Sequence, residues 1–558
     1  MTVTVTAPPP AAPGPVATTG RPPSQGWWAV LIFAALSGLY GAVGTVLMLR
    51  YNLFDPDSPS RVANAGYAVY SRDPHLSAIG FVWNPLPSLA EIPLMPLSRW
   101  WPELKVNGLA GVVQSALFMA GSALWVRRIC YDVALSTWWR WIAVGGYALN
   151  PVIVIYGGSG MSEAAELFAG MWCVCYLMRW IRSSMVTDLG WAAIALALGY
   201  LARYEILVAA FAAAGLVAAL SWVRSPRESR GPAVAINVLV LLFPIVTAVA
   251  VWAVAGWVVS GDLFAQLSSR YGNSGQVAAV RGHGVHDAAG NASVQLLAAR
   301  LFTVQPFTAL AVAIALAVAM MRKRVEVLVP VVVFGSVLAF AFWAQHRGTL
   351  FPLFRYFLPA IPLVIVIVVV CTATPRWPSR VGTAALVLTV LVATPLTVKS
   401  MLNPDIGNQP LQFGLRSLID PDRYPANEQW YRREMLDDRG AAEFLDRKKL
   451  PRGSVLVDTF SGWGIWLASD NPEQFVVTSD YDFTADLNRL WESGIRYVVV
   501  SKSDLTVPDA VTLRYPSLWD KGFDNATLVY SANGPTGTER RRIYRIEAPS
   551  TRHRSTQR

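Results

Sequence analysis

The chain has 558 residues, of which 54% are hydrophobic and only 15% are charged, with a mean hydropathy of +0.38. Soluble domains carry about a quarter charged residues, so this composition excludes a water-soluble globular protein. The net charge is +11, but the basic residues form short clusters between apolar runs rather than one patch. That pattern orients membrane helices and gives no indication of nucleic-acid binding.

Residues 1–26 are rich in Pro, Ala and Thr and are expected to form a disordered cytoplasmic tail. No short apolar segment with a cleavage site follows this tail, so the first helix is predicted to be an uncleaved anchor. The four cysteines fall in or at the ends of apolar runs. Cys173 and Cys175 face away from each other on a helix, so neither a disulfide framework nor a zinc site is expected.

The apolar runs within residues 27–400 predict about eleven membrane-spanning helices, because a span needs roughly 20 apolar residues and must satisfy its own backbone. The predicted spans are 27–49, 105–126, 139–156, 163–181, 188–203, 205–223, 233–259, 298–321, 325–345, 357–373 and 381–398. Prolines interrupt 81–98. We therefore assign it to a long first outer loop, 50–104, that lies along the membrane interface.

Basic residues in the loops predict the orientation. They form five clusters: Arg127, Arg128 and Arg140; Arg179 and Arg182; Arg224, Arg227 and Arg230; Arg322, Lys323 and Arg324; Arg376 and Arg380. All five clusters fall on one side if the N-terminus is cytoplasmic, as the positive-inside rule requires. An odd number of crossings then places residues 401–558 outside the plasma membrane.

Residues 401–558 are more polar and predict a small extracytoplasmic α/β domain. β-Branched runs at 453–458, 474–480, 495–501 and 527–531 indicate strands, and helical patterns occur near 438–449 and 484–493.

Ionisable and polar side chains gather in the predicted outer loops. They are Asp55, Asp57, Arg61, His75 and Asn84 in the first loop, Glu163 in the second, Arg203, Tyr204 and Glu205 in LARYE, and Arg355 and Tyr356 in FRYF. Arg203 and Arg355 stand at the mouths of apolar segments, where a charge needs a partner. A lipid-carrier phosphate would suit a guanidinium group. The alternative is an ion pair with Glu163, Glu205 or an aspartate of the first loop.

Asp55 and Asp57 directly follow the first span. A carboxylate there could take the proton of an acceptor hydroxyl, although two aspartates around a proline also favour a simple turn. They also match the D-x-D pattern of nucleotide-sugar enzymes, but nucleotide sugars are cytoplasmic and this loop is predicted outside.

Two further segments, one acidic and one containing histidines, can be explained by structure alone as well as by function. Glu163 and Glu166 share a helical face, which also suits the dipole at a helix start. His283, His286 and Asp287 could bind a divalent cation or form only a Gly-rich loop. The sequence requires no cofactor and leaves a divalent cation open.

The segment DSPSRVANAGYAVYSRDPHLSAIGFVWNPLPSLAEIPL (57–94) resembles the first outer loop of the GT-C superfamily of polyprenyl-phosphate-dependent glycosyltransferases. NPVIVIYGGSGMSE (150–163), LARYE (201–205) and FRYFLPAIPL (354–363) resemble other segments of that superfamily. The nearest likeness is to the protein-mannosyltransferase and aminoarabinose-transferase branch, and the composition resembles that of actinobacterial proteins. Asn84 departs from the aminoarabinose-transferase pattern, which carries a lysine before these prolines.

The resemblance implies a helical GT-C fold and a multi-pass enzyme that moves a sugar, such as mannose or a pentose, to an acceptor hydroxyl. The donor would be a polyprenyl-phosphate sugar, and the acceptor a glycan, glycolipid or protein at the cell envelope. Asp57 takes the place of the catalytic aspartate, with Asp55 in reserve. Candidate phosphate ligands are Arg203, Arg355 and Arg61, and candidate substrate-binding residues are Glu163, Tyr204, Glu205, His75, Asn84 and Tyr356.

Two other functions remain as alternatives. A lipid or sugar transporter would place its polar site near the membrane midplane in two related halves. Here the charges cluster on one face, and no matching halves are evident. A non-catalytic envelope-assembly protein would tolerate loss of Asp57.

Overall fold

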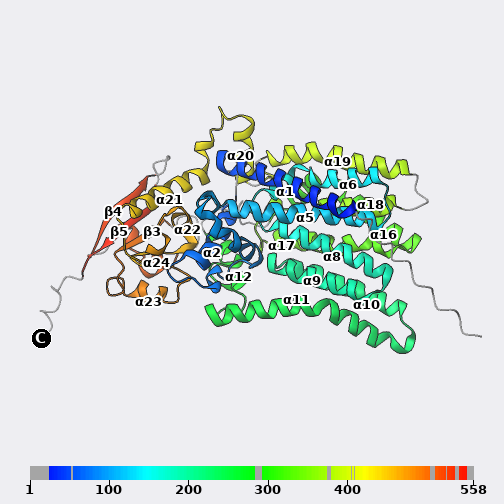
Figure 1. Cartoon of the computed structure of the whole chain (residues 1–558), viewed down its shortest axis with the longest axis horizontal. Coiled ribbons are helices and arrows are strands. Elements are labelled where there is room, and N and C mark those ends of the chain that lie inside the picture. Colours follow the sequence, from blue (N-terminus) through cyan, green and yellow to red (C-terminus); the bar gives the residue numbers. More distant parts are fainter. Residues whose placement is uncertain are drawn as a thin grey trace, which may run out of the picture.

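The computed structural model describes residues 24–51, 55–282, 292–373, 379–403, 405–407, 409–502, 509–522, 525–533 and 539–548. Helices dominate the described chain, and the strands all belong to its C-terminal part. Figure 1 shows a bundle of long, nearly parallel helices, with the sheet at one end of it and α2 between the two. The fold is that of a polytopic helical membrane protein with a small C-terminal α/β region.

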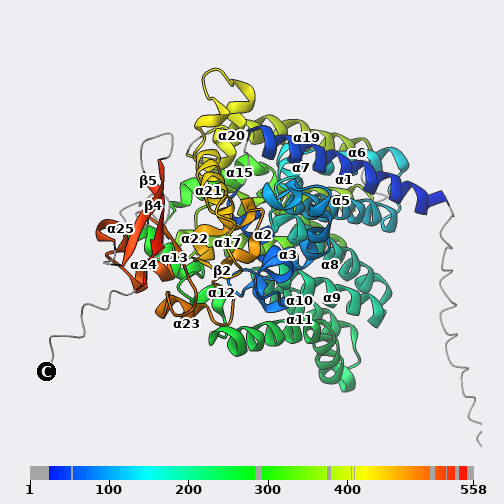
Figure 2. The same ribbon diagram turned by 60° about the vertical axis from the view of Figure 1, so that its left-hand side comes forward.

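The bundle consists of the longer helices of residues 24–401. They are α1 (Ser24–Tyr51), α5 (Leu109–Asp132), α6 (Thr137–Ala148), α7 (Pro151–Gly157), α8 (Glu163–Ser183), α9 (Val186–Ala202), α10 (Ile206–Arg224), α11 (Arg230–Ser260), α15 (Val294–Val304), α16 (Thr308–Arg322), α17 (Ser336–His346), α18 (Ala360–Thr372) and α19 (Ser379–Met401). Shorter helices at the end nearer the sheet are α2 (Asp57–Tyr70), α3 (Leu86–Glu91), α4 (Glu103–Val106), α12 (Ala265–Ser268) and α13 (Asn273–Gly282). Figure 2 shows α1 beside α19 and α6 along one edge of the bundle.

Seven of the described helical segments are long and apolar enough to span a membrane, and the bent pair α15 and α16 would make an eighth. All the predicted spans fall on helices. The predicted total of about eleven also includes α6 with 12 residues, α9 with 17 residues, and α19. Large apolar side chains of α11, among them Leu239, Phe243 and Val251, remain exposed, as expected for a surface that faces lipid.

Two predicted spans are broken at a proline. Span 139–156 divides into α6 and α7, because Pro151 lacks an N–H group and keeps Asn150 extended. The Asn150 side chain then caps α7 by accepting from Val152 N at 3.0 Å. Span 298–321 bends by 78° between α15 and α16, where Gln305 is extended before Pro306.

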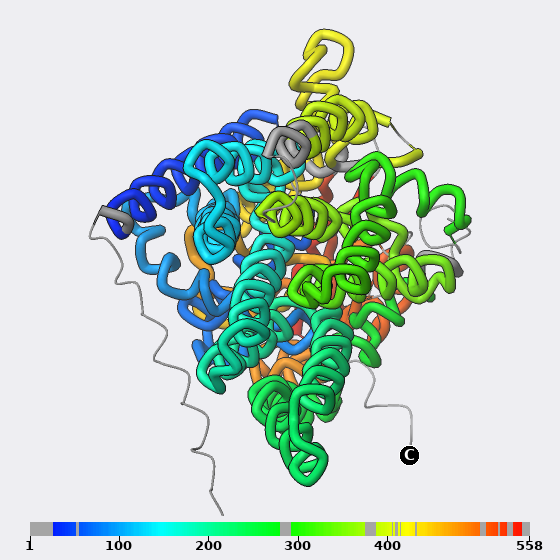
Figure 3. The backbone as a smooth tube through the Cα atoms, turned by 90° about the vertical axis from the view of Figure 1, so that its right-hand side faces the viewer, coloured from blue at the N-terminus to red at the C-terminus, as the bar shows by residue number. Residues whose placement is uncertain are grey.

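Four of the five predicted basic clusters lie at one end of the bundle. Figure 3 looks along the helices from the end opposite the sheet. Contacts join the clusters across neighbouring helices: Arg182 donates to the carbonyl of Asp132, Arg140 lies over Tyr131, and Arg224 lies over Trp180. Of the fifth cluster, Arg376 and the side chain of Arg380 lie outside the described part of the structure.

The C-terminal part contains a five-stranded sheet in the order β2-β1-β3-β5-β4. The parallel strands are β1 (Val455–Val457), β2 (Phe475–Val477) and β3 (Tyr497–Ser501), and β5 (Glu539–Ile546) and β4 (Ala526–Asn533) continue the sheet antiparallel. Its helices are α20 (Gln409–Ile419), α21 (Trp430–Asp446), α22 (Thr459–Ala468), α23 (Phe483–Asn488), α24 (Ala510–Arg514) and α25 (Leu518–Lys521). The predicted strands all occur, whereas β5 and α22 were not predicted.

The C-terminal part and the first outer loop share one hydrophobic core. Tyr67 of α2 and Trp466 of α22 are fully buried, with ring centroids 4.6 Å apart. Gly66 allows this approach, since a Cβ there would lie 2.6 Å from the Trp466 ring. Lys105 Nζ donates to the carbonyl of Ser469 at 2.7 Å, and Arg72 pairs with Asp480 at 3.2 Å. The C-terminal part therefore holds α2 in place.

Candidate functional site

The first turn of α2 positions two aspartates at the end of the bundle nearer the sheet. Asp57 begins the helix, where the dipole favours a carboxylate. Asp55 Oδ1 accepts from Asp57 N at 3.2 Å, and Ser58 N donates to the Asp55 carbonyl at 2.9 Å, so the predicted turn is present. Both carboxylates have a second role, because they point to an arginine nearly 300 residues later in the chain.

Arg355 is the point at which three acidic side chains meet. Its Nη1 lies 2.5 Å from Asp55 Oδ2, its Nη2 lies 2.8 Å from Asp57 Oδ2, and its Nε lies 3.2 Å from Glu163 Oε1. The Arg355 side chain is 8% exposed, but those of Asp55 and Asp57 are 21% and 23% exposed. The two aspartates thus form the accessible edge of a buried ion-pair network.

Arg203 forms the inner half of the same network. Glu163 Oε1 pairs with Arg203 Nη1 at 2.7 Å, so one carboxylate oxygen contacts both arginines. Glu205 pairs with Nη2 at 2.7 Å and Glu166 with Nε at 3.2 Å. The Tyr356 ring lies beneath this guanidinium, 4.8 Å from Cζ. The structure therefore shows the predicted ion-pair alternative for both Arg203 and Arg355.

Arg61 differs from the other two arginines of the site. It lies one helical turn after Asp57 and is 5% exposed, with its Cζ 4.5 Å from the centroid of the Trp83 ring. Its Nη1 is 3.3 Å from the Asp57 carbonyl oxygen and 3.9 Å from Met161 Sδ, and its Nε is buried without a partner. Among the described residues, no carboxylate lies within ion-pair distance of Arg61. Burial lowers the pKa of this guanidinium, and the charges of Asp57 and Glu163 oppose that shift.

The remaining predicted site residues, Asn84, Tyr204 and His75, make packing or hydrogen-bond contacts outside the carboxylate network. Asn84 is buried and donates to the carbonyl of Tyr200, so it fastens the first loop to the end of α9 beside Arg203. Tyr204 is half-buried and packs against the core of the bundle. His75 stacks on Tyr481 of the C-terminal part with centroids 4.4 Å apart, rather than joining the carboxylates.

Close backbone packing sets the second outer loop against α2. Gly160 has a φ of +75°, and a Cβ there would lie 2.0 Å from Ser58 Oγ. This approach brings Met161 to the two arginines that face it, with its sulfur 4.0 Å from Arg355 Nη1. The sequence prediction missed Met161 and Trp83. Neither residue carries a charge that would have drawn attention to it. The one available signal was position in the sequence: Met161 lies two residues before Glu163, and Trp83 directly precedes Asn84.

The ion pairs join five carboxylates, those of Asp55, Asp57, Glu163, Glu166 and Glu205, to two guanidinium groups, those of Arg203 and Arg355. Burial is the main cause that raises the pKa of the Asp55 carboxyl to about 6, and the charge of Arg355 opposes it. Asp55 therefore changes charge near pH 6, within a range where activity can be measured.

No group of three or more His, Cys, Asp or Glu side chains among the described residues is arranged to hold a metal ion. His283, His286 and Asp287 lie outside the described residues. The divalent cation remains a prediction, and no part of the function proposed below depends on it.

A comparison with protein-family models found no matching family, and a comparison with curated proteins found no match. Among solved structures, the chain is similar to oligosaccharyltransferases of Archaeoglobus fulgidus. The archaeal oligosaccharyltransferase AglB, in complex with an inhibitory peptide and a dolichol-phosphate, has a TM-score of 0.44 and 12% identity, over 92% of this chain and 74% of that chain. A complex with Zn and sulfate has a TM-score of 0.39 and 13% identity, over 90% and 72% of the two chains. A form tethered to an acceptor peptide has a TM-score of 0.38 and 13% identity, over 92% and 74%.

Replacing Arg203 with glutamine should strongly destabilise the protein, because three buried carboxylates lose their common cation. We expect a loss of about 3–5 kcal/mol, the range for breaking a buried ion pair from one side. Thermal unfolding of the detergent-solubilised protein would measure it. The control is Arg179→Gln, because Arg179 pairs with Asp188 at 3.2 Å but is 33% exposed, so its loss should cost at most about 1 kcal/mol. Equal effects of the two substitutions would show that the Arg203 network is not a special stabilising contact.

Proposed function

We propose that this chain is a membrane glycosyltransferase of the GT-C type, which transfers a sugar from a polyprenyl-phosphate donor to an acceptor hydroxyl. One observation carries the proposal: accessible aspartates at the start of α2 lie near a buried arginine, Arg61, for which no carboxylate of the described residues lies within ion-pair distance. This arrangement supports a site in which an aspartate base would act beside a bound anion. A transporter does not require it, and an assembly protein would gain nothing from it.

Asp57 is the better placed of the two aspartates to act as the base. Its Oδ2 is held by Arg355 at 2.8 Å, while no described residue forms a hydrogen bond with its Oδ1. Asp55, by contrast, uses Oδ2 for Arg355 and Oδ1 for the amide of Asp57. Asp57 can therefore accept the acceptor's proton through Oδ1 without breaking its ion pair. As the acceptor oxygen attacks the anomeric carbon, the bond from that carbon to the phosphate oxygen breaks, and the carrier phosphate leaves with the electron pair.

Arg61 is the proposed ligand of the donor phosphate. A buried guanidinium without a counter-ion is costly, and a phosphate would supply the missing charge in a bidentate geometry. The stacked Trp83 ring fixes the guanidinium plane, so little side-chain freedom is lost on binding. Arg203 and Arg355 are occupied by carboxylates. We assign them to positioning Asp57 and Glu163 rather than to direct phosphate contact.

The location of the site supports an outer-face reaction. The basic clusters mark the opposite end of the bundle, which the positive-inside rule assigns to the cytoplasm. The aspartates, Arg61 and the C-terminal part would then face the outside, where polyprenyl-linked donors meet glycan, glycolipid or protein acceptors. The apolar tail of the donor would lie against the helices of the bundle.

Asp57→Asn should lower the release of sugar from synthetic polyprenyl-phosphate sugars by at least about 100-fold, because the base is lost while the side-chain shape is kept. Purified protein would be assayed with mannose and pentose donors in the presence of an acceptor. Asp73→Asn is the control, because Asp73 lies in the same loop with a side chain 48% exposed, and its activity should be unchanged. Full turnover by a folded Asp57→Asn protein would remove Asp57 as the base.

The reaction should slow as the pH falls through about 6, because protonation of Asp55 removes one of the carboxylates that hold Arg355. The sign follows from the raised pKa: Asp55 is charged above this pH and neutral below it. In Asp55→Asn the acid-side fall near pH 6 should move away from this pH, because the group that causes it is gone. A pH–rate profile measures this, and an unshifted inflection in the variant would exclude Asp55 as its origin.

Arg61→Gln should raise the KM for the donor by about 10- to 100-fold, the effect of losing hydrogen bonds between charged groups. The kcat should change less, and Arg61→Lys should recover only part of the affinity, because an ammonium lacks the guanidinium fork. Steady-state kinetics at a fixed acceptor concentration would separate the two constants. An unchanged donor KM in Arg61→Gln would assign the phosphate to another cation.

A further inference from the structure

A pocket of about 450 Å³ lies in the C-terminal part, apart from the carboxylate network. It is lined by Leu450, Trp491, Arg496, Tyr497, Arg545, Ile546, Glu547 and Ala548. These residues come from the segments before β1 and β3, from β3 itself, and from the end of β5. Small-molecule sites commonly enclose about 300–1,000 Å³, so the pocket is large enough for a ligand of several rings or groups.

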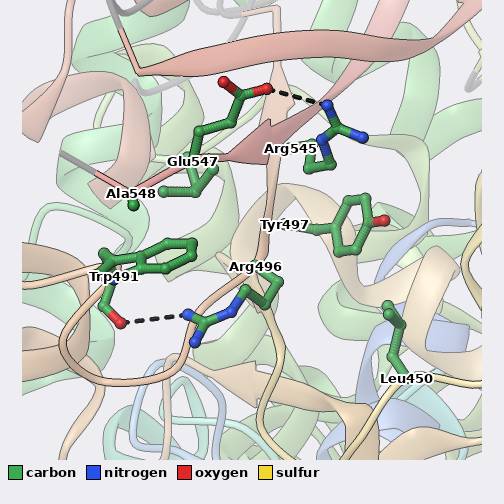
Figure 4. Close-up of a pocket in the computed structure, with 8 residues that line it drawn as sticks. Leu450, Trp491, Arg496, Tyr497, Arg545, Glu547 and Ala548 are labelled. Atoms are coloured by element: carbon green, nitrogen blue, oxygen red, sulfur yellow. Dashed lines mark hydrogen bonds and ion pairs between the residues drawn. The ribbon is translucent and has the colours of Figure 1, made fainter. Parts of the chain in front are cut away.

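Two half-buried aromatic rings line this pocket. Figure 4 shows Trp491 and Tyr497 on opposite sides of it, with Arg545 and Glu547 near its upper edge. The Arg496 guanidinium carbon lies 4.0 Å from the centroid of the Trp491 ring, and its Nη1 donates to the Trp491 carbonyl at 3.2 Å. The ring and the guanidinium are thus held in a fixed relation before any ligand binds.

The charge of the pocket favours an anion. Arg545 pairs with Glu547 at 2.9 Å, but both side chains are about half exposed, so this ion pair is weak and open to exchange. Arg496 has no carboxylate within ion-pair distance among the described residues. Among the lining residues Arg496 and Arg545 are basic and Glu547 is acidic, so the lining has a formal excess of one positive charge. This charge favours an approaching anion.

We propose that this pocket binds an anionic saccharide. Sugar rings present flat C–H faces that pack on aromatic rings, and their hydroxyls suit the polar edges of Tyr and Arg. A carboxylate or phosphate on the sugar would form an ion pair with the guanidinium of Arg496. A simple phosphate would not use the two rings. The identity of this saccharide rests on the proposed function: the pocket would hold the glycan acceptor.

The test is calorimetric binding of trigalacturonate to the full-length protein in detergent, with its fully methyl-esterified form as the uncharged match. We expect saturable binding of the acid that weakens with added salt, and at least about tenfold weaker binding of the ester. Arg496→Gln should reduce binding of the acid to the level of the ester. Trp491→Ala should remove binding of both saccharides.

The matched control is Trp519→Ala. Trp519 also carries a stacked arginine, with Arg542 Cζ 4.6 Å from its ring centroid, but it does not line the pocket. Its loss should leave binding unchanged. The proposal is overturned if Arg496→Gln binds the acid like the wild type, if neither saccharide binds, or if inorganic phosphate competes at equal concentration. Because sugar release from the donor is assayed separately, loss of binding with normal turnover would refute the pocket and leave the proposed function standing.

Discussion

The carboxylate of Glu163 holds two buried guanidinium groups at once, and the geometry of the candidate site depends on that contact. One oxygen reaches Arg203 and Arg355, which come from segments about 150 residues apart in the chain. Each arginine then contacts further acids. The start of α8, the end of α9, the 3-10 helix Phe354–Phe357 before α18 and the first turn of α2 therefore meet at one point. A buried network of this kind costs desolvation energy and adds little net stability. Its effect here is to fix direction, since the two Nη atoms of each guanidinium donate to two different carboxylates.

The accessible chemistry lies at the edge of this network. Asp55 and Asp57 keep about a fifth of their side-chain surface, while the acids around Arg203 are nearly sealed. Arg61 lies on the same helix as Asp57, but its charge is balanced by no carboxylate within ion-pair distance among the described residues. Under the proposed function, Arg355 would act by orienting the two aspartates, which it holds directly. Arg61 would keep its donors for the phosphate of the donor.

Much of the architecture was predictable from the sequence, because long apolar runs and clustered arginines report directly on membrane helices. The prolines at positions 151 and 306 were visible too, but a hydropathy window averages over breaks of two and three residues. Strand β5 was missed because it carries four arginines, Arg540, Arg541, Arg542 and Arg545, and one of them, Arg541, is buried together with Ile543, Tyr544 and Ile546. Several of the predicted site residues lie together in the structure, and the sequence pointed to them because charges at the ends of apolar runs are rare. Their functional role stays a prediction. Their pairing was not predictable: which carboxylate meets which arginine depends on how the helices pack. His75 shows the same limit, because its partner Tyr481 belongs to a part of the chain with no sequence signal for that contact.

The core shared by α2 and the C-terminal part also sets the order in which the protein can mature. Arg72 and its partner Asp480 are 408 positions apart, and Tyr67 can pack against Trp466 only after the C-terminal part has been synthesised. During synthesis the first outer loop emerges early, yet the residues that complete its packing are made after every helix of the bundle. The packing of the loop must therefore remain incomplete until the final portion of the chain has been made. A polypeptide cut short by translation or proteolysis could still insert its helices, but it would lack a properly seated α2, and with it Asp57 and Arg61.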